Sequence, residues 1–182
     1  MHSKPLALAL ALAATLGCPA AFATDVALVA DGSWNVFDVD PAIAASGGNE
    51  WIDLTDGSSM ALRFSGPVTI KIIDGGFAGD TFKVYDNGLL LGITSVAVDS
   101  YPDSKRFDFD DAWTAGYSHA TFVLGPGNHV ITGELSRFAL DDTGNPIGAT
   151  VGAIAAVPEP ASHALLAAGL GLVGLAARRR IH

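Results

Sequence analysis

The chain has 182 residues, 49% of them hydrophobic, and carries 19 acidic against 10 basic side chains. Lys4, Glu159 and three arginines near the C-terminus fall outside residues 24–156, which therefore hold 18 acidic and 6 basic side chains, a net charge of −12. So acidic a segment repels phosphate backbones, and nucleic acid is excluded as an expected partner.

The first 23 residues have the three parts of a secretory signal peptide. Lys4 gives a basic start, residues 6–14 are an unbroken Leu and Ala run, and Ala21 and Ala23 form a small-x-small cleavage site. Cleavage after Ala23 leaves a mature chain without cysteine, so the exported domain must rely on its core rather than on disulfides. The alternative is lipidation at Cys18, because the residues before it weakly resemble a lipoprotein box.

Residues 24–156 are expected to form one exported domain built from short strands. Runs rich in β-branched and aromatic residues recur between turn residues, and no strong amphipathic helix is predicted. Asn87-Gly88 predicts a tight hairpin, because both residues tolerate positive φ, and residues 125–128 predict a second one. Residues 99–111 contain five aspartates and are expected to be a surface loop. The expected strands are 26–30, 34–39, 51–54, 60–64, 68–73, 81–85, 89–98, 120–124, 129–135 and 147–155.

Nine or ten short strands at this spacing favour an all-β fold. The sequence therefore predicts a single antiparallel β-sandwich of jelly-roll type over residues 24–156. A signal peptide (residues 1–23) is expected before it, and a C-terminal signal (residues 157–182) after it.

Three aspartates around one predicted strand are candidate calcium ligands. Asp74 and Asp80 lie in the glycine-rich connection before the strand, and Asp86 lies at its end. Calcium takes carboxylate and carbonyl oxygens, which loops at the end of a sandwich supply. The alternative is that these aspartates form turns with their own backbone. Residues 80–86 also resemble the strand of CUB domains that carries a calcium-binding aspartate, although that family's cysteines are absent. No other cofactor is indicated.

Aromatic residues offer a second kind of binding site. Trp34, Trp51 and Trp113 could stack on sugar rings of a glycan, and the alternative is that they fill the core of the sandwich.

No set of residues predicts catalysis. Ser118 lies in a segment that superficially resembles a serine nucleophile elbow but lacks its second glycine and its α/β surroundings. His119 and His129 make no zinc set, and the aspartates of residues 108–111 are expected to be a solvated acidic loop. The domain is therefore predicted not to be an enzyme, with no catalytic residue.

The C-terminal residues 161–177 form an uncharged run rich in Leu, Ala and Gly. As a helix they would extend roughly 25 Å, the short end of a membrane span. Pro158 and Pro160 block helix continuation before the run, and an arginine cluster after it would stay in the cytoplasm. A transmembrane helix is therefore predicted here. The alternative is a buried core helix of a soluble domain.

The order of these parts resembles the PEP-CTERM sorting signal of Gram-negative bacteria, also known as the "ice-binding protein C-terminal domain", a label that does not imply ice binding. The resemblance covers residues 157–182 and implies processing by an exosortase, with cleavage near the proline-containing triplet. It also implies export across the inner membrane, anchoring there, and a final place in the cell envelope or outside the cell. The residues that carry the signal are Val157, Pro158, Glu159, Pro160, Arg178, Arg179 and Arg180.

The resemblance and the domain together give the expected function. We expect a non-enzymatic structural or adhesive protein of the envelope or matrix, with exosortase, the membrane and exopolysaccharide as partners. The alternative is a calcium- or glycan-binding β-sandwich module, and a third hypothesis is an enzyme with an unrecognised site.

Overall fold

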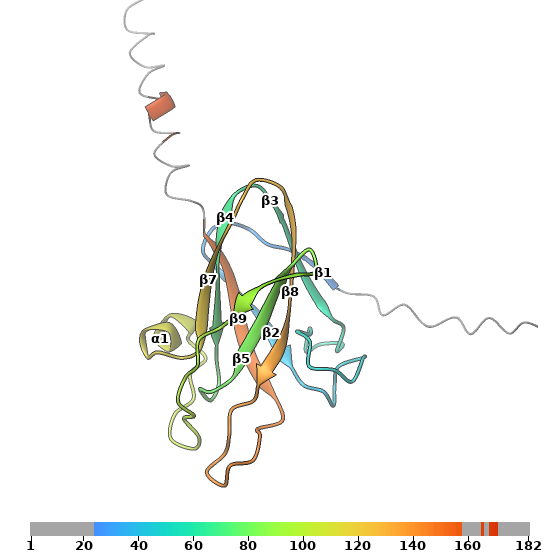
Figure 1. Ribbon diagram of the computed structural model, residues 1–182, viewed down its shortest axis with the longest axis vertical. Coiled ribbons are helices and arrows are strands. Elements are labelled where there is room, and N and C mark those ends of the chain that lie inside the picture. Colours follow the sequence, from blue (N-terminus) through green and yellow to red (C-terminus); the bar gives the residue numbers. More distant parts are fainter. Residues whose placement is uncertain (1–23, 158–164, 166–167, 171–182) are drawn as a thin grey trace, which may run out of the picture.

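The computed structural model describes residues 24–157, 165 and 168–170, and in this part of the chain two β-sheets pack face to face (Figure 1). One sheet has the strand order β1-β3-β8-β5-β6 and the other has the order β2-β9-β4-β7. The all-β sandwich predicted from the sequence is confirmed. The strands are β1 (Thr24–Ala27), β2 (Trp34–Val39), β3 (Met60–Ser65), β4 (Val68–Asp74), β5 (Thr81–Asp86), β6 (Leu89–Ile93), β7 (His119–Leu124), β8 (Asn128–Arg137) and β9 (Thr150–Val157).

The chain crosses between the two sheets at almost every connection. From β2 to β9, each strand lies in the opposite sheet from the strand before it, except β6, which follows β5 in the same sheet. This is the strand order of a jelly roll. The described pairs are antiparallel apart from β1, which runs parallel to β3, so the expectation of a purely antiparallel sandwich was wrong at this edge.

The two predicted hairpins have different outcomes. Asn87 and Gly88 have φ values of 49° and 78°, and β5 and β6 pair across them, as predicted. The predicted hairpin at residues 125–128 is wrong, because β7 pairs with β4 while β8 pairs with β3 and β5. The turn there carries the chain from one sheet to the other.

Aromatic side chains fill the space between the sheets. Phe37 stacks on Trp51 with ring centroids 4.0 Å apart, and Phe82 meets Phe37 edge-on at 5.1 Å. All three are fully buried. Gly133 lies under Trp51 and Gly152 under Phe37, where a Cβ atom would overlap the ring. The absence of side chains at these two positions lets large rings occupy a thin core.

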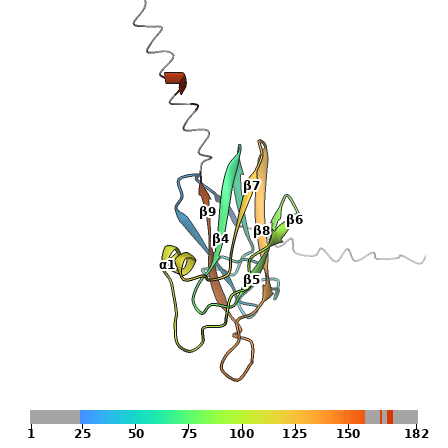
Figure 2. The same cartoon turned by 60° about the vertical axis from the view of Figure 1, so that its left-hand side comes forward.

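Other segments differ from their predicted limits. Residues 51–54 form only two isolated bridges, both at Ile52, to Asp38 and Ser59. Strand β6 ends at Ile93 rather than continuing to residue 98, and β9 begins at Thr150 rather than at residue 147. Residues 99–111 were expected to be loop throughout, but the helix α1 (Phe109–Thr114) begins within them. The Asp108 side chain caps this helix by accepting from the amides of Asp110 and Asp111, while Phe109 is buried beneath it. In Figure 2, α1 and β6 lie on opposite sides of the sandwich.

The predicted terminal signals fall largely beyond what the structure describes. The predicted signal peptide (residues 1–23), with Ala21 and Ala23, lies outside the described residues. So does most of the predicted transmembrane helix, residues 161–177. In the described part of the chain there is no helix of the length and apolar character needed to cross a bilayer.

Candidate functional site

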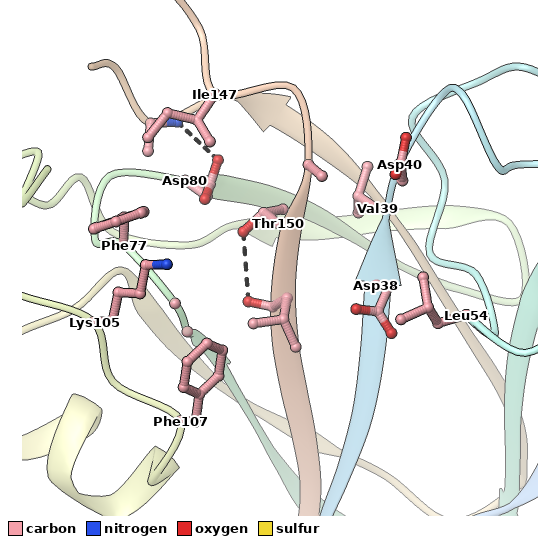
Figure 3. A pocket seen from close by; sticks show the side chains of 15 residues that line it. Asp38, Val39, Asp40, Leu54, Phe77, Asp80, Lys105, Phe107, Ile147 and Thr150 are labelled. Carbon is pink, nitrogen blue, oxygen red and sulfur yellow. Dashed lines mark hydrogen bonds between the residues drawn. The ribbon is translucent and has the colours of Figure 1, made fainter. Parts of the chain in front are cut away.

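A pocket of about 430 Å³ opens at the end of the sandwich opposite to Val157, where β9 ends (Figure 3). Its floor is the start of β9, at Thr150 and Val151, and the adjacent backbone of Gly75 and Gly76 that follows β4. The pocket therefore lies where β2, β4, β8 and β9 end or begin and where their connections meet.

One wall of the pocket is aromatic and cationic. Phe77 comes from the β4–β5 connection, and Lys105 and Phe107 come from the segment before α1 (Figure 3). The Lys105 Nζ lies over the Phe77 ring, 4.7 Å from its centroid, and Tyr101 packs edge-on against the same ring at 4.9 Å. Phe107 is 66% exposed, so a large apolar surface remains open to solvent at the mouth.

The opposite wall carries carboxylates. The Asp38 side chain, which β2 supplies, lies on this wall, and the side chains of Asp40 and Leu54 lie beside it (Figure 3). Partial burial, together with the nearby Asp53 and Asp40 carboxylates, raises the pKa of Asp38. The ion pairs within the described residues are made by Arg63, Lys83, His129 and Arg137, so Lys105 is not paired with these carboxylates.

Beneath the pocket, two aspartates are buried side by side. The Asp74 Oδ2 accepts hydrogen bonds from the amides of Gly79 and Asp80, at 3.0 and 3.2 Å, whereas its Oδ1 is buried without a partner. The Asp80 Oδ1 accepts from the Ala139 amide at 2.8 Å, and Asp80 also lines the deep end of the pocket. Burial and the Asp80 carboxylate raise the pKa of Asp74 to about 9. Burial raises the pKa of Asp80 to about 6, although its hydrogen bonds lower it.

A third carboxylate, that of Asp99, links the loops around the buried aspartates to β8. The Asp99 Oδ2 pairs with Arg137 at 2.6 Å, and the Asp99 Oδ1 accepts from the Leu140 amide at 3.0 Å. Arg137 also donates to the Gly79 carbonyl. The loops that surround the pocket are therefore held to one another by buried and half-buried polar contacts.

The predicted calcium ligands are not brought to one point. Asp74 and Asp80 are neighbours, but Asp86 lies at the other end of β5, roughly 20 Å away along a strand of this length. There the Asp86 Oδ2 bonds to the Nδ1 of His129 at 2.8 Å. No cluster of three or more acidic, histidine or cysteine side chains suited to a metal ion occurs among the described residues. The trio is therefore not a single site. Calcium binding at Asp74 and Asp80 stays a prediction, as does the CUB-like character of residues 80–86.

The tryptophans predicted as sugar platforms lie away from the pocket. Trp51 is fully buried in the core. Trp34 and Trp113 are half-buried and pack against each other with ring centroids 6.3 Å apart. Trp113 belongs to α1, and the Lys71 Nζ lies over its ring, 5.2 Å from the centroid. All three tryptophans therefore pack inside or against the domain, as the alternative interpretation stated.

The segment that resembles a nucleophile elbow has its polar groups engaged in structural contacts. Ser118 is fully buried, and its hydroxyl bonds to the Thr94 hydroxyl at 2.6 Å. The Nδ1 of His119 lies 2.7 Å from the Tyr117 carbonyl. Neither Ser118 nor His119 lines the pocket.

Apart from Asp80, which was a candidate calcium ligand, the pocket residues were missed by sequence analysis. Asp38, Leu54, Phe77, Lys105 and Phe107 come from four separate segments and show no common spacing. The available signal was the presence of three aromatic residues, Tyr101, Phe107 and Phe109, in a segment expected to be a polar loop.

Comparison with known proteins bears on the C-terminal part of the chain. A family model described as the PEP-CTERM protein-sorting motif matches residues 156–180. No curated protein matches the sequence. Among solved structures, the pre-peptidase C-terminal domain of a collagenase from Bacillus anthracis is similar at 8% identity and a TM-score of 0.37, with 74% of this chain and 94% of that chain covered. Val157 is the one predicted signal residue within the described part, and the others, Pro158, Glu159, Pro160, Arg178, Arg179 and Arg180, lie outside it. Residues 156–180 are therefore a PEP-CTERM protein-sorting motif, and this chain carries one.

Proposed function

We propose that this protein is an exosortase substrate that is exported across the inner membrane, anchored there through its C-terminal segment, and delivered to the cell envelope or extracellular matrix. In that place it has a non-enzymatic structural or adhesive role associated with exopolysaccharide. The observation that carries this proposal is the PEP-CTERM motif at residues 156–180.

The surface of the domain supports a structural role. Edge strand β6 exposes Leu89, Leu90 and Ile93, and Val96 and Val98 continue the exposed apolar surface beyond the strand. Residues 88–98 carry no charge, in a domain whose net charge is −12. An uncharged, apolar sheet edge is a favourable surface for association with another chain.

The positions of the hydroxyl and imidazole groups support a role without catalysis. Ser118 is buried and bonded to another hydroxyl, and His119 is held by a backbone carbonyl. A nucleophile and its base need to reach one another beside a substrate. These two residues do not line the pocket that a substrate would enter.

A ligand-binding module is the second candidate. The pocket at the start of β9 has the mixed aromatic and carboxylate lining that favours a glycan. Of the two ligands predicted for the domain, calcium and glycan, the pocket therefore supports the glycan.

The sorting proposal is tested by replacing Pro158, Glu159 and Pro160 with alanine in the full-length chain. We expect an unprocessed C-terminus and retention in the inner-membrane fraction, because the exosortase would no longer recognise its substrate. Mass spectrometry of the C-terminal peptide and fractionation of the cells measure both effects.

A matched control carries alanine at Asp142, Thr143 and Pro146, three exposed residues of the connection between β8 and β9. The control should be processed and located as the unaltered protein is. If the motif variant and the control behave alike, the proposed sorting through this triplet is wrong.

A further inference from the structure

We propose that the pocket binds an amine-bearing sugar ring, such as an amino-sugar unit of a polysaccharide. This inference rests on the second candidate above and names its ligand class.

The size of the pocket suits a short stretch of sugar chain. Its volume of about 430 Å³ falls within the roughly 300–1,000 Å³ that is typical of small-molecule sites. The floor is made of the Gly75 and Gly76 backbone and the start of β9, so a sugar ring can approach the backbone closely at the two glycines. The two walls face each other across this floor (Figure 3).

The aromatic wall provides a surface for the apolar face of a sugar ring. The C–H groups on one face of a pyranose bury apolar area when they pack on an aromatic ring. Phe107 offers such a ring, since it is largely exposed at the mouth of the pocket. The Phe77 ring is shared with Lys105 and Tyr101, which hold it in place.

The opposite wall supplies acceptors for the hydroxyl and amine groups. Asp38 and Asp40 each present a carboxylate there, and the buried Asp80 carboxylate adds negative charge at the deep end. Lys105 is the single basic side chain that lines the pocket, so the lining has a net charge of −2 when all four groups are ionised. An ammonium group gains charge-assisted hydrogen bonds in such a lining, whereas a ligand carboxylate is repelled.

The charge of the whole domain acts in the same direction. With 18 acidic and 6 basic side chains in residues 24–156, the domain attracts a polycation and repels a polyanion before contact. The pocket lining and the long-range field therefore select the same class of polysaccharide.

The inference is tested by isothermal titration of the purified full-length protein in detergent. The ligands are tetrasaccharides of glucosamine, glucose and mannuronic acid that share one linkage. We expect glucosamine to bind most tightly, glucose roughly tenfold more weakly because it lacks the charged group, and mannuronic acid weakest of the three. The inference is overturned if none of the three binds, or if the anionic sugar binds best.

Two variants locate the site. Phe107→Ala should weaken binding of glucosamine and glucose alike by roughly tenfold, because it removes the ring surface that both share. Asp38→Asn should reduce the preference for glucosamine over glucose while leaving glucose binding nearly unchanged.

Matched controls are Val123→Ala, at an exposed apolar residue of β7 near the other end of the sandwich, and Asp111→Asn, at an exposed aspartate of α1. Neither should change the affinity, and equal effects in variants and controls would contradict the proposed site. Processing and location are measured separately in the motif variants. A failure to bind sugar would therefore leave the sorting proposal standing, and a failure of sorting would not alter the titration.

Discussion

Asp74 is the most unusual ionisable residue of the described domain, because it is fully buried and its Oδ1 lacks a hydrogen-bond partner. Its folded pKa of about 9 exceeds the unfolded value of 3.8, so the folded state holds the proton more tightly. This contribution to stability is fully present below pH 3.8 and is lost progressively as the pH rises towards 9.

The Asp74→Asn variant should therefore be more stable than the unaltered protein at pH 7 and above. Asparagine keeps the oxygen that accepts from the Gly79 and Asp80 amides and is neutral at every pH. We expect a gain on the order of 1–4 kcal/mol at pH 7 and almost none at pH 4, measured by urea unfolding.

Asp111→Asn, at an exposed position, is the control and should change stability little at either pH. A loss of stability in the Asp74 variant at pH 7, reproduced in the unaltered protein by a calcium chelator, would mean that the carboxylate is ionised and holds a cation. That result would overturn the protonated state and support the calcium prediction.

Edge strand β6 is the element with the clearest consequence for assembly. Its outer edge is unpaired in the described chain. It exposes two leucines, and no residue between 88 and 98 carries a charge. Natural sheet edges commonly carry lysine or proline that opposes pairing with another chain. Strand β6 has neither residue, although its pairing with β5 contains one register shift at Leu91. We therefore expect two copies to associate through β6.

Leu90→Lys should lower this self-association, because a charged side chain at the edge must be desolvated or repelled when two copies meet. Analytical ultracentrifugation over a range of protein concentrations measures it. Val29→Lys adds the same charge at an exposed loop position and should leave association unchanged. A protein that stays monomeric throughout would contradict the role assigned to β6.

Local signals made part of the fold predictable at the level of elements. Asn87-Gly88 fixes both the reversal of the chain and the pairing of its flanking strands, since a two-residue turn leaves no other partner within reach. The turn at residues 125–128 also reverses the chain, but whether β8 pairs with β7 or enters the other sheet depends on the packing of distant strands. Helix α1 was missed because six residues are too few to show a helical period, although Asp108 before Phe109 is a capping signal.

Across the whole molecule, the sorting motif could be predicted and the pocket could not, for the same physical reason. The motif is read as one continuous segment, so its pattern is present in the sequence itself. The pocket is assembled by jelly-roll crossings that bring Asp38 of β2 together with Phe77 and Phe107 from two different connections. Burial of Asp74 and Asp80 was likewise unpredictable, because aspartates beside glycines are usual in exposed turns.

The stability of the whole domain should be greatest in mildly acidic solution, because two groups of residues act in opposite directions. Hydrogen bonds from Ser33, Thr143 and Lys83 lower the pKa values of Asp31, Asp141 and Glu134, respectively, so their contribution is present above about pH 4 and lost in stronger acid. The folded pKa is about 6 for Asp80 and about 9 for Asp74. The contribution of each residue to stability is therefore lost as the pH rises from 3.8 to its folded pKa.

His129 acts in the same direction as the two buried aspartates. Burial lowers its pKa, but the hydrogen bonds to the Asp86 carboxylate and the Gly125 carbonyl raise it by more. Both ring nitrogens face acceptors, so the protonated ring satisfies both bonds. This contribution is complete below about pH 6.5 and is lost as the pH rises through the raised folded value.

We therefore expect the free energy of unfolding to be highest near about pH 4 and to fall steadily towards pH 9, as measured by urea unfolding in buffers of constant ionic strength. The double variant Asp74→Asn, His129→Gln should flatten the alkaline side of this curve and leave the acidic side unchanged, because the acid-sensitive carboxylates remain. A free energy that instead rises continuously to pH 8 would show that cations compensate the buried carboxylates, so that the acid-sensitive group of residues outweighs the alkali-sensitive one.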